Sequence, residues 1–237
     1  MKKIVIVLSV LAVLVAVYQI AYPSVTIRYR LTLEAELNGQ PRTGSGVIQV
    51  VYRTNVQFLG ASAQIGIEVQ GDAVSVDLDK GDALFALLTE GKQHPRSGPE
   101  YVIPNLFGIV NGGFGPEAFG RIGTLKGQRD VPFEFIPLMV RLFDTNNPKS
   151  AILFTPPGGQ PPNQALILKK AMIEIVSPGI WPLNLLGITG VPITRGIGKK
   201  LPWLAGFRGY SGGQLHPDWS QPEKNLTGAD FSLGASL

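Results

Sequence analysis

The chain contains no cysteine, and this absence removes several kinds of site at once. It excludes a disulfide framework, a thiolate metal site and a lipid-modified N-terminal cysteine. Only two histidines occur, His94 and His216, and both precede a proline in a polar stretch. No paired spacing such as H-x-x-x-H joins them, so we predict two surface histidines and neither a metal site nor a cofactor.

Motifs for nucleotide or hydrolytic chemistry are scarce. No Gly-Lys precedes Ser or Thr in the frame of a phosphate-binding loop, and no G-x-G-x-x-G lies between a strand and a helix. Gly209 to Gly213 matches the G-x-S-x-G nucleophile elbow by letter, but it lacks the flanking strand and helix that this motif requires. Residues 77–82 match part of a calcium-binding loop without its distal Glu. We predict a Gly-rich turn for the first and a β-turn over 79–82 for the second.

The strongest positive feature is an apolar run from Ile4 to Tyr22, which directly follows Lys2 and Lys3. As a helix, this run spans roughly 28 Å, close to the thickness of the hydrocarbon core of a bilayer. Pro23 comes next, and proline stops a helix. The sequence therefore predicts an uncleaved transmembrane signal-anchor helix over residues 1–23.

A cleaved signal peptide and a buried core helix are the alternatives. The run is longer than the usual signal core, and the nearest cleavage site, ending at Ala21, has Gln19 where a small residue is expected. The basic start favours a cytoplasmic N-terminus, although Arg28 and Arg30 lie just beyond the other end. We expect the chain in a bacterial inner (plasma) membrane, with its C-terminal domain in the periplasm.

Residues 24–237 predict one β-rich extracytoplasmic domain. Apolar and polar residues alternate strictly from Val25 to Leu37, which is the period of a half-buried strand. Asn38-Gly39 then predicts a hairpin turn, and Gly44 to Tyr52 predicts the returning strand. This pattern indicates a mainly β fold, an antiparallel β-sandwich or barrel-like domain. Further strands are predicted over 65–69, 73–78, 83–88, 151–155 and 165–176.

The pattern is less regular elsewhere. Pro116 to Ile122 predicts one short helix with a proline in its first turn. Two prolines within residues 131–143 predict an edge strand or an irregular segment. Residues 155–162 predict an exposed loop, and residues 177–190 predict an apolar insertion.

Positive charge gathers late in the chain, where residues 145–217 carry seven basic side chains and one acidic one. The stretch from Arg195 to Tyr210 combines basic and aromatic residues and has no acid, which favours contact with lipid headgroups or with a protein partner. Core packing of the aromatic rings is the alternative. Because an exported domain rarely meets nucleic acid, we expect no such partner. The predicted contact residues, which include one from the apolar insertion, are Trp181, Lys199, Lys200, Trp203, Phe207, Arg208 and Tyr210.

Four stretches carry a resemblance to known proteins. They are YRLTLEAELNGQPRTGSGVIQVVYR (29–53), GDAVSVDLDKGDALFALL (71–88), LILKKAMIEI (166–175) and VPITRGIGKKLPWL (191–204). Together they resemble a family of uncharacterised bacterial proteins with an N-terminal hydrophobic anchor and a β-rich body. In that family the last two stretches are nearly contiguous, so residues 177–190 look inserted, and Gly198 stands where an acidic residue is usual. The resemblance implies this architecture and no activity, cofactor or site residue.

The sequence thus favours a membrane-anchored, non-enzymatic protein that binds or supports a partner in the same membrane or envelope. An envelope hydrolase is one alternative, because Ser211, His216 and Asp218 lie close together in the sequence. A carrier of a lipid or another small apolar ligand is the other. Convergent catalytic groups in a cleft would favour the hydrolase, and a continuous apolar cavity would favour the carrier.

Overall fold

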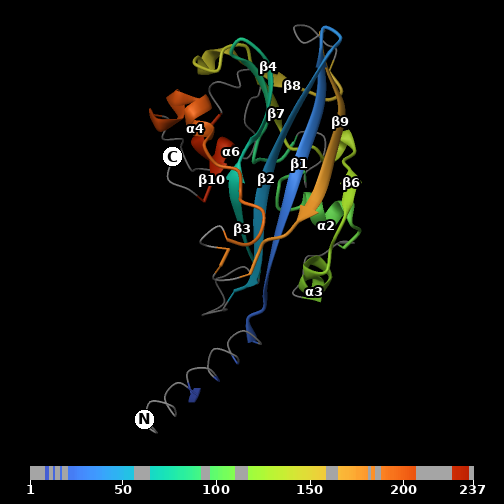
Figure 1. Ribbon diagram of the computed structural model, residues 1–237, viewed down its shortest axis with the longest axis vertical. Coiled ribbons are helices and arrows are strands. Elements are labelled where there is room, and N and C mark those ends of the chain that lie inside the picture. Colours follow the sequence, from blue (N-terminus) through green and yellow to red (C-terminus); the bar gives the residue numbers. More distant parts are fainter. Residues whose placement is uncertain are drawn as a thin grey trace.

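The fold is mainly β, as predicted, and consists of two antiparallel sheets with a few short helices (Figure 1). This arrangement agrees with the sandwich alternative. It comes from a computed structural model that describes residues 9–10, 13, 17, 21–55, 65–91, 97–109, 117–158, 165–180, 183–184, 188–206 and 226–234.

The larger sheet has six strands, in the order β10 (Ser232–Leu233), β3 (Ile65–Asp72), β2 (Gln40–Thr54), β1 (Ser24–Leu37), β9 (Leu166–Val176) and β6 (Gln128–Asp130). Its centre is the predicted hairpin of β1 and β2, which pair from Ser24 with Arg53 to Leu37 with Gln40. The turn residues Asn38 and Gly39 have positive φ angles of 51° and 78°, as a tight hairpin turn requires. The returning chain of β9 pairs with the other side of β1.

The smaller sheet has four strands, in the order β4 (Val74–Asp79), β5 (Asp82–Ala86), β7 (Met139–Leu142) and β8 (Ala151–Phe154). The predicted turn over 79–82 joins β4 to β5, with Gly81 at a φ of 89°. Strand β7 lies inside the sheet, between β5 and β8, where the sequence predicted an edge strand or an irregular segment. The reason is that Pro132 and Pro137 both precede β7, so neither removes a hydrogen bond from its ladder.

The smaller sheet is covered on both faces. One face packs on the larger sheet through a core that includes Tyr29, Val50 and Leu84. The other face is covered by α4 (Ile197–Lys200), η3 (Pro202–Gly206) and α6 (Gly228–Phe231), which contribute the second core (Figure 1). Because both faces are buried, residues 83–88 are all apolar and all buried instead of alternating.

Between the strands, the described residues form four other short helices: α2 (Val102–Leu106), α3 (Glu117–Gly123), η1 (Phe133–Phe135) and η2 (Pro148–Ser150). Helix α3 confirms the predicted helix and packs near the start of β1, with the ring centroid of Phe119 lying 6.4 Å from that of Tyr52. Helix α2 was not predicted, because its five residues include Pro104 and no side chain caps its N-terminus.

The predicted anchor falls largely outside the described residues, which exclude 1–8, 11–12, 14–16 and 18–20. Val10, Val13 and Val17 are helical and between 54 and 61% exposed. Among the described residues, no helix has the length and apolar character to cross a bilayer. The membrane-spanning helix therefore stays a prediction. Of the predicted loop over 155–162, only residues 155–158 are described.

Asp72, the last residue of β3, joins three elements of the fold from a position that is only 2% exposed. Its Oδ2 accepts a hydrogen bond of 2.9 Å from the backbone N–H of Ile197, at the start of α4. Its Oδ1 accepts one of 2.7 Å from the hydroxyl of Ser232 in β10, and Nη1 of Arg195 lies 3.9 Å from the same oxygen. We call α4, η3 and α6 the C-terminal cover, because they cover the second face of the smaller sheet. This cover is attached to the larger sheet through the Asp72 carboxylate.

Strand β2 of the larger sheet passes close to β4 of the smaller sheet at Gly44 and Gly46. A Cβ on Gly44 would lie 1.9 Å from the backbone oxygen of Ser75 in β4. A Cβ on Gly46 would lie 2.9 Å from Cγ2 of Val74. Glycine therefore lets β2 pass close to β4.

We expect the Gly44→Ala substitution to lower the free energy of unfolding by about 1–3 kcal/mol, because the added methyl group must push β2 and β4 apart. Urea denaturation measures this loss. Gly198→Ala in α4 is the matched control, since its Cβ meets nothing within 4 Å. That control should be neutral or stabilising by up to about 1 kcal/mol. Equal losses in the two variants would contradict the close approach.

Two buried tyrosines hold the turn that precedes α2. The hydroxyl of Tyr29 donates a 3.0 Å hydrogen bond to the backbone oxygen of Pro99, and that of Tyr52 donates one of 2.6 Å to the oxygen of Glu100. Burial raises the pKa of both tyrosine hydroxyls, so both stay protonated donors. Burial also raises the pKa of the Glu100 carboxyl, and the charge of Glu90 raises it further.

We expect Glu100→Gln to stabilise the fold near neutral pH and to have no effect in acid. A carboxyl with a raised pKa binds its proton more tightly when folded, so stability falls as the pH rises above its ordinary pKa of 4.5. Glutamine is always neutral and avoids this loss. Urea denaturation at about pH 3.5 and about pH 7.5 tests the difference. Glu134 is exposed, so the Glu134→Gln control should show no gain in stability. A gain in stability from Glu100→Gln at both pH values would refute a raised pKa at Glu100.

Candidate functional site

The predicted basic and aromatic segment is described up to residue 206, and it packs onto the smaller sheet. Nζ of Lys200 donates a 2.8 Å hydrogen bond to the hydroxyl of Ser75 and forms an ion pair with Asp77. Nε1 of Trp203 donates a 2.8 Å hydrogen bond to the backbone oxygen of Thr145. The indole ring packs edge-on against Phe231, with the centroids 5.6 Å apart.

The ring of Trp203 therefore packs against the second core, as the core-packing alternative proposed. Lys200 is 29% exposed along its side chain, whereas Lys199 is exposed. A partner-binding role for these three residues stays a prediction. The other predicted contact residues lie outside the described part of the chain: Trp181, Phe207, Arg208 and Tyr210.

The residues that suggested a hydrolase also lie outside the described ranges, so that alternative stays a hypothesis. They are Ser211, His216 and Asp218, and the same is true of His94. Within the part of the chain that the structure describes, no cluster of three acidic or histidine side chains could hold a metal ion. The calcium-like residues 77–82 form the β4–β5 turn instead.

A polar cleft of about 220 Å³ opens beside this turn. Arg141 holds Asp82 there with two hydrogen bonds, of 3.0 Å from Nε and 2.6 Å from Nη2. Nε of Arg42 is buried and has no hydrogen-bond partner among the described residues. The cleft mixes acids with their cationic partners, which is typical of a structural charge network. Its lining residues are Arg42, Asp77, Leu78, Asp79, Lys80, Gly81, Asp82, Thr145 and Lys200.

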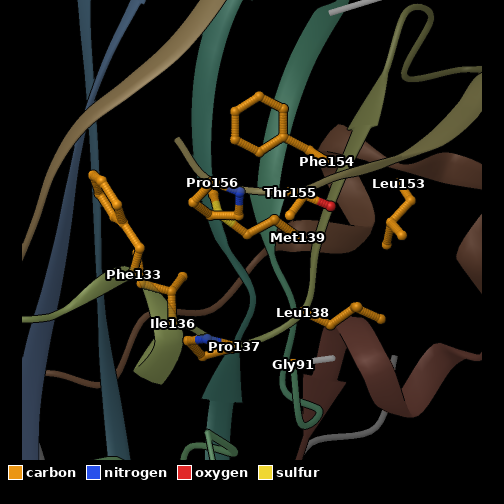
Figure 2. Close-up of a pocket in the computed structure, with 10 residues that line it drawn as sticks. All are labelled: Gly91, Phe133, Ile136, Pro137, Leu138, Met139, Leu153, Phe154, Thr155 and Pro156. Atoms are coloured by element: carbon orange, nitrogen blue, oxygen red, sulfur yellow. The ribbon is translucent and has the colours of Figure 1, made fainter. Parts of the chain in front are cut away.

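A small apolar cavity lies at the margin of the core, where Figure 2 shows Phe133 and Ile136 on one side and Phe154 above Met139. Its volume is about 30 Å³. Pockets that hold small ligands are roughly ten times larger or more, so this cavity is too small for a lipid or another small apolar ligand. It gives the carrier alternative no support.

The apolar insertion 177–190 forms a loop whose ends are tied together. The backbone N–H of Val191 donates a 2.9 Å hydrogen bond to the oxygen of Ser177. Gly179 and Gly190 have φ angles of 81° and 80°, and they meet where the two ends come together. A Cβ on Gly190 would lie 2.6 Å from the backbone N of Gly179. The two ends of the loop therefore lie in contact, which the two glycines allow.

This apolar loop exposes large hydrophobic side chains. Ile180, Leu183 and Ile188 are 69, 40 and 66% exposed. Elsewhere in the described part of 21–234, only Phe143 is a large exposed hydrophobic residue, at 41%. The sequence of the loop contains no charged residue. Three exposed apolar side chains in one uncharged stretch make this loop a candidate interaction surface.

The apolar loop lies toward the end of the larger sheet where β1 begins. Strand β9 ends at Val176, which pairs with Arg28 near the start of β1. Nη1 of Arg28 donates a 2.7 Å hydrogen bond to the oxygen of Val191, where the chain leaves the loop. Figure 1 shows this segment in the lower half, on the side from which the chain enters β1, with α4 in the upper half. The described parts of the apolar loop therefore lie apart from α4.

Sequence reasoning found the apolar content of this loop but not its closed shape. The closure depends on a contact between Gly179 and Gly190. The only local signal was the pair of glycines that bound the apolar residues.

Comparisons of this chain with protein-family models, with curated proteins and with solved structures find no match.

Proposed function

We propose that this chain is a membrane-anchored, non-enzymatic β-domain protein that binds or supports a partner in the same membrane or envelope. In this proposal, residues 1–23 are a signal anchor in a bacterial inner membrane, with a cytoplasmic N-terminus and a periplasmic domain. Neither a cofactor nor a metal is required.

The observation that carries the proposal is that two apolar features lie toward the same end of the domain. The apolar run 4–22 meets β1 with only Pro23 between them. The oxygen of Pro23 accepts a 3.1 Å hydrogen bond from the N–H of Thr54, so the junction is attached to β2. The apolar loop begins and ends near this end of the larger sheet, beside Arg28. A tether this short holds the domain close to the bilayer.

Anchoring also explains how a surface of modest size can be sufficient. A partner in the same membrane meets the domain at a high local concentration, so even weak contacts give substantial occupancy. The exposed part of the basic and aromatic segment, which includes Lys199, is a candidate partner surface. It lies away from the junction and is open to a neighbouring protein that extends from the membrane.

We expect the full chain to stay in the membrane pellet after alkaline carbonate extraction. The variant with Val10→Arg and Val13→Arg should lose this retention, because each arginine near the centre of a span costs about 2.5–3.5 kcal/mol on insertion. The variant with Val10→Leu and Val13→Leu is the matched control and should be retained. A soluble product that begins after Ala21, identified by mass spectrometry, would refute the anchor.

A cross-linking experiment tests the partner. Cells that express the full chain are cross-linked, and the chain is purified in detergent. We expect the chain to be recovered with a cross-linked membrane or envelope protein. Recovery of the chain alone, as a monomer without a neighbour, would count against the binding function even if the anchor is real.

A further inference from the structure

We propose that the apolar loop 177–190 is a second membrane contact, which inserts Ile180, Leu183 and Ile188 into the boundary between the headgroups and acyl chains of the bilayer. This inference depends on the proposed function, because the anchor is what brings the loop to the bilayer. It goes further by assigning a lipid surface as the binding partner of one defined loop.

The apolar loop has exposed hydrophobic side chains and no charged residue. Ile180 and Ile188 are each about two-thirds exposed, at 69 and 66%. Isolated exposed apolar residues are normal on a soluble surface, but these lie in one short loop with no charge. Insertion into a bilayer would remove this apolar area from water, and no charged group of the loop would have to be desolvated.

Hydrogen bonds inside the loop satisfy several of its backbone groups. The N–H of Ile180 donates a 3.0 Å hydrogen bond to Oγ1 of Thr189, and that of Asn184 donates one of 2.9 Å to the oxygen of Ile180. The N–H of Ile188 donates one of 3.1 Å to the oxygen of Leu183. Unpaired backbone groups are costly away from water, so internal pairing suits a loop that enters a bilayer.

The loop begins near the start of β1, which directly follows the proposed anchor. Val176, just before the loop, pairs with Arg28, which is four residues from the start of β1. At the rise of a β-strand this is about 14 Å along the sheet. Because Pro23 is hydrogen-bonded to Thr54, the domain cannot move far from the end of the apolar run. The bilayer is therefore the apolar surface nearest to the loop, and it is favoured over a second copy or another protein.

The test uses the absence of cysteine, because a single introduced thiol labels one position. Ile180→Cys and Ile188→Cys in the full chain are each labelled with an environment-sensitive fluorophore. Both positions are exposed, so the label should not disturb the core. Gln40→Cys, at the exposed turn end of the β1–β2 hairpin, is the matched control. Urea denaturation confirms that each labelled protein folds like the parent chain.

The labelled proteins are reconstituted into vesicles of phosphatidylethanolamine and phosphatidylglycerol, with and without nitroxide-labelled lipid. We expect blue-shifted emission at positions 180 and 188 that nitroxide lipid strongly quenches, and no such quenching at position 40. Emission from 180 and 188 that stays unquenched would overturn the proposal. A blue shift without lipid quenching would also overturn it, because protein would then cover the loop.

Carbonate extraction of the same vesicles distinguishes this inference from the proposed function. Retained protein with unquenched loop labels would refute the loop contact and leave the anchor intact. Extracted protein would refute the anchor and therefore both proposals, whether or not the loop labels are quenched before extraction.

Discussion

Replacement of Asp72 with alanine is expected to lower the free energy of unfolding by about 3–5 kcal/mol. The carboxylate is buried and accepts hydrogen bonds from the N–H of Ile197 and the hydroxyl of Ser232. Without it, both donors lose their partner, and the nearby guanidinium of Arg195 loses its opposite charge. Unpaired groups of this kind are costly when buried. The loss also loosens the cover over the second core.

Urea denaturation measures this effect, and Asp77→Ala is the matched control. Asp77 also pairs with a cation, Lys200, but its side chain is 76% exposed. Exposed ion pairs contribute at most about 1 kcal/mol, so the control should change stability little. Asp72→Asn keeps the shape and one acceptor oxygen, and its loss should be intermediate. If Asp72→Ala and Asp77→Ala cost the same, Asp72 does not hold the cover.

Arg141→Ala should lower the free energy of unfolding by a similar amount, about 3–5 kcal/mol, because it leaves a largely buried carboxylate without its cation. Arg141 and Asp82 join neighbouring strands β7 and β5, and their side chains are only 7 and 15% exposed. The guanidinium also lies over the ring of Phe143, 4.3 Å from its centroid. The loss should appear as a lower urea midpoint with an unchanged slope.

Two controls define the origin of that loss. Arg30 and Glu174 form an ion pair at the same distance of 2.6 Å, but their side chains are 37 and 44% exposed. Arg30→Ala should therefore cost at most about 1 kcal/mol. The double replacement of Arg141 by Met and Asp82 by Leu should recover most of the stability, because it removes both charges and puts apolar side chains in their place. A double variant as unstable as Arg141→Ala would refute the buried-charge explanation.

The local parts of the fold could be predicted from the sequence. Strand β1 shows strict alternation, and Asn38-Gly39 specifies its turn, so the first hairpin needs no information from the rest of the chain. Residues 83–88 show a continuous apolar run, but this run does not reveal what covers the second face of the sheet. Strand β7 was not predicted as an interior strand. It has only four residues and follows an irregular segment that contains proline, so no hydrophobic period is visible there.

The charged contacts that join distant elements could not be predicted in the same way. Asp72 lies 125 residues before Ile197 and 160 before Ser232. Nothing near Asp72 in the sequence distinguishes it from the exposed Asp77 or Asp79. For the candidate site, the apolar character of residues 177–190 was visible, whereas the closed loop and its position near the start of β1 depend on tertiary contacts.

The cover on the second face of the smaller sheet has a consequence for how the chain folds. Strands β4, β5, β7 and β8 all precede the residues that shield Phe85 and Val140, and Phe231 reaches that face from near the C-terminus. A growing chain must therefore carry an uncovered apolar sheet until its last segments arrive. Long-range closure of this kind is slow. Interruption of the chain before residue 226 should thus give an aggregation-prone product that depends on chaperones for its solubility.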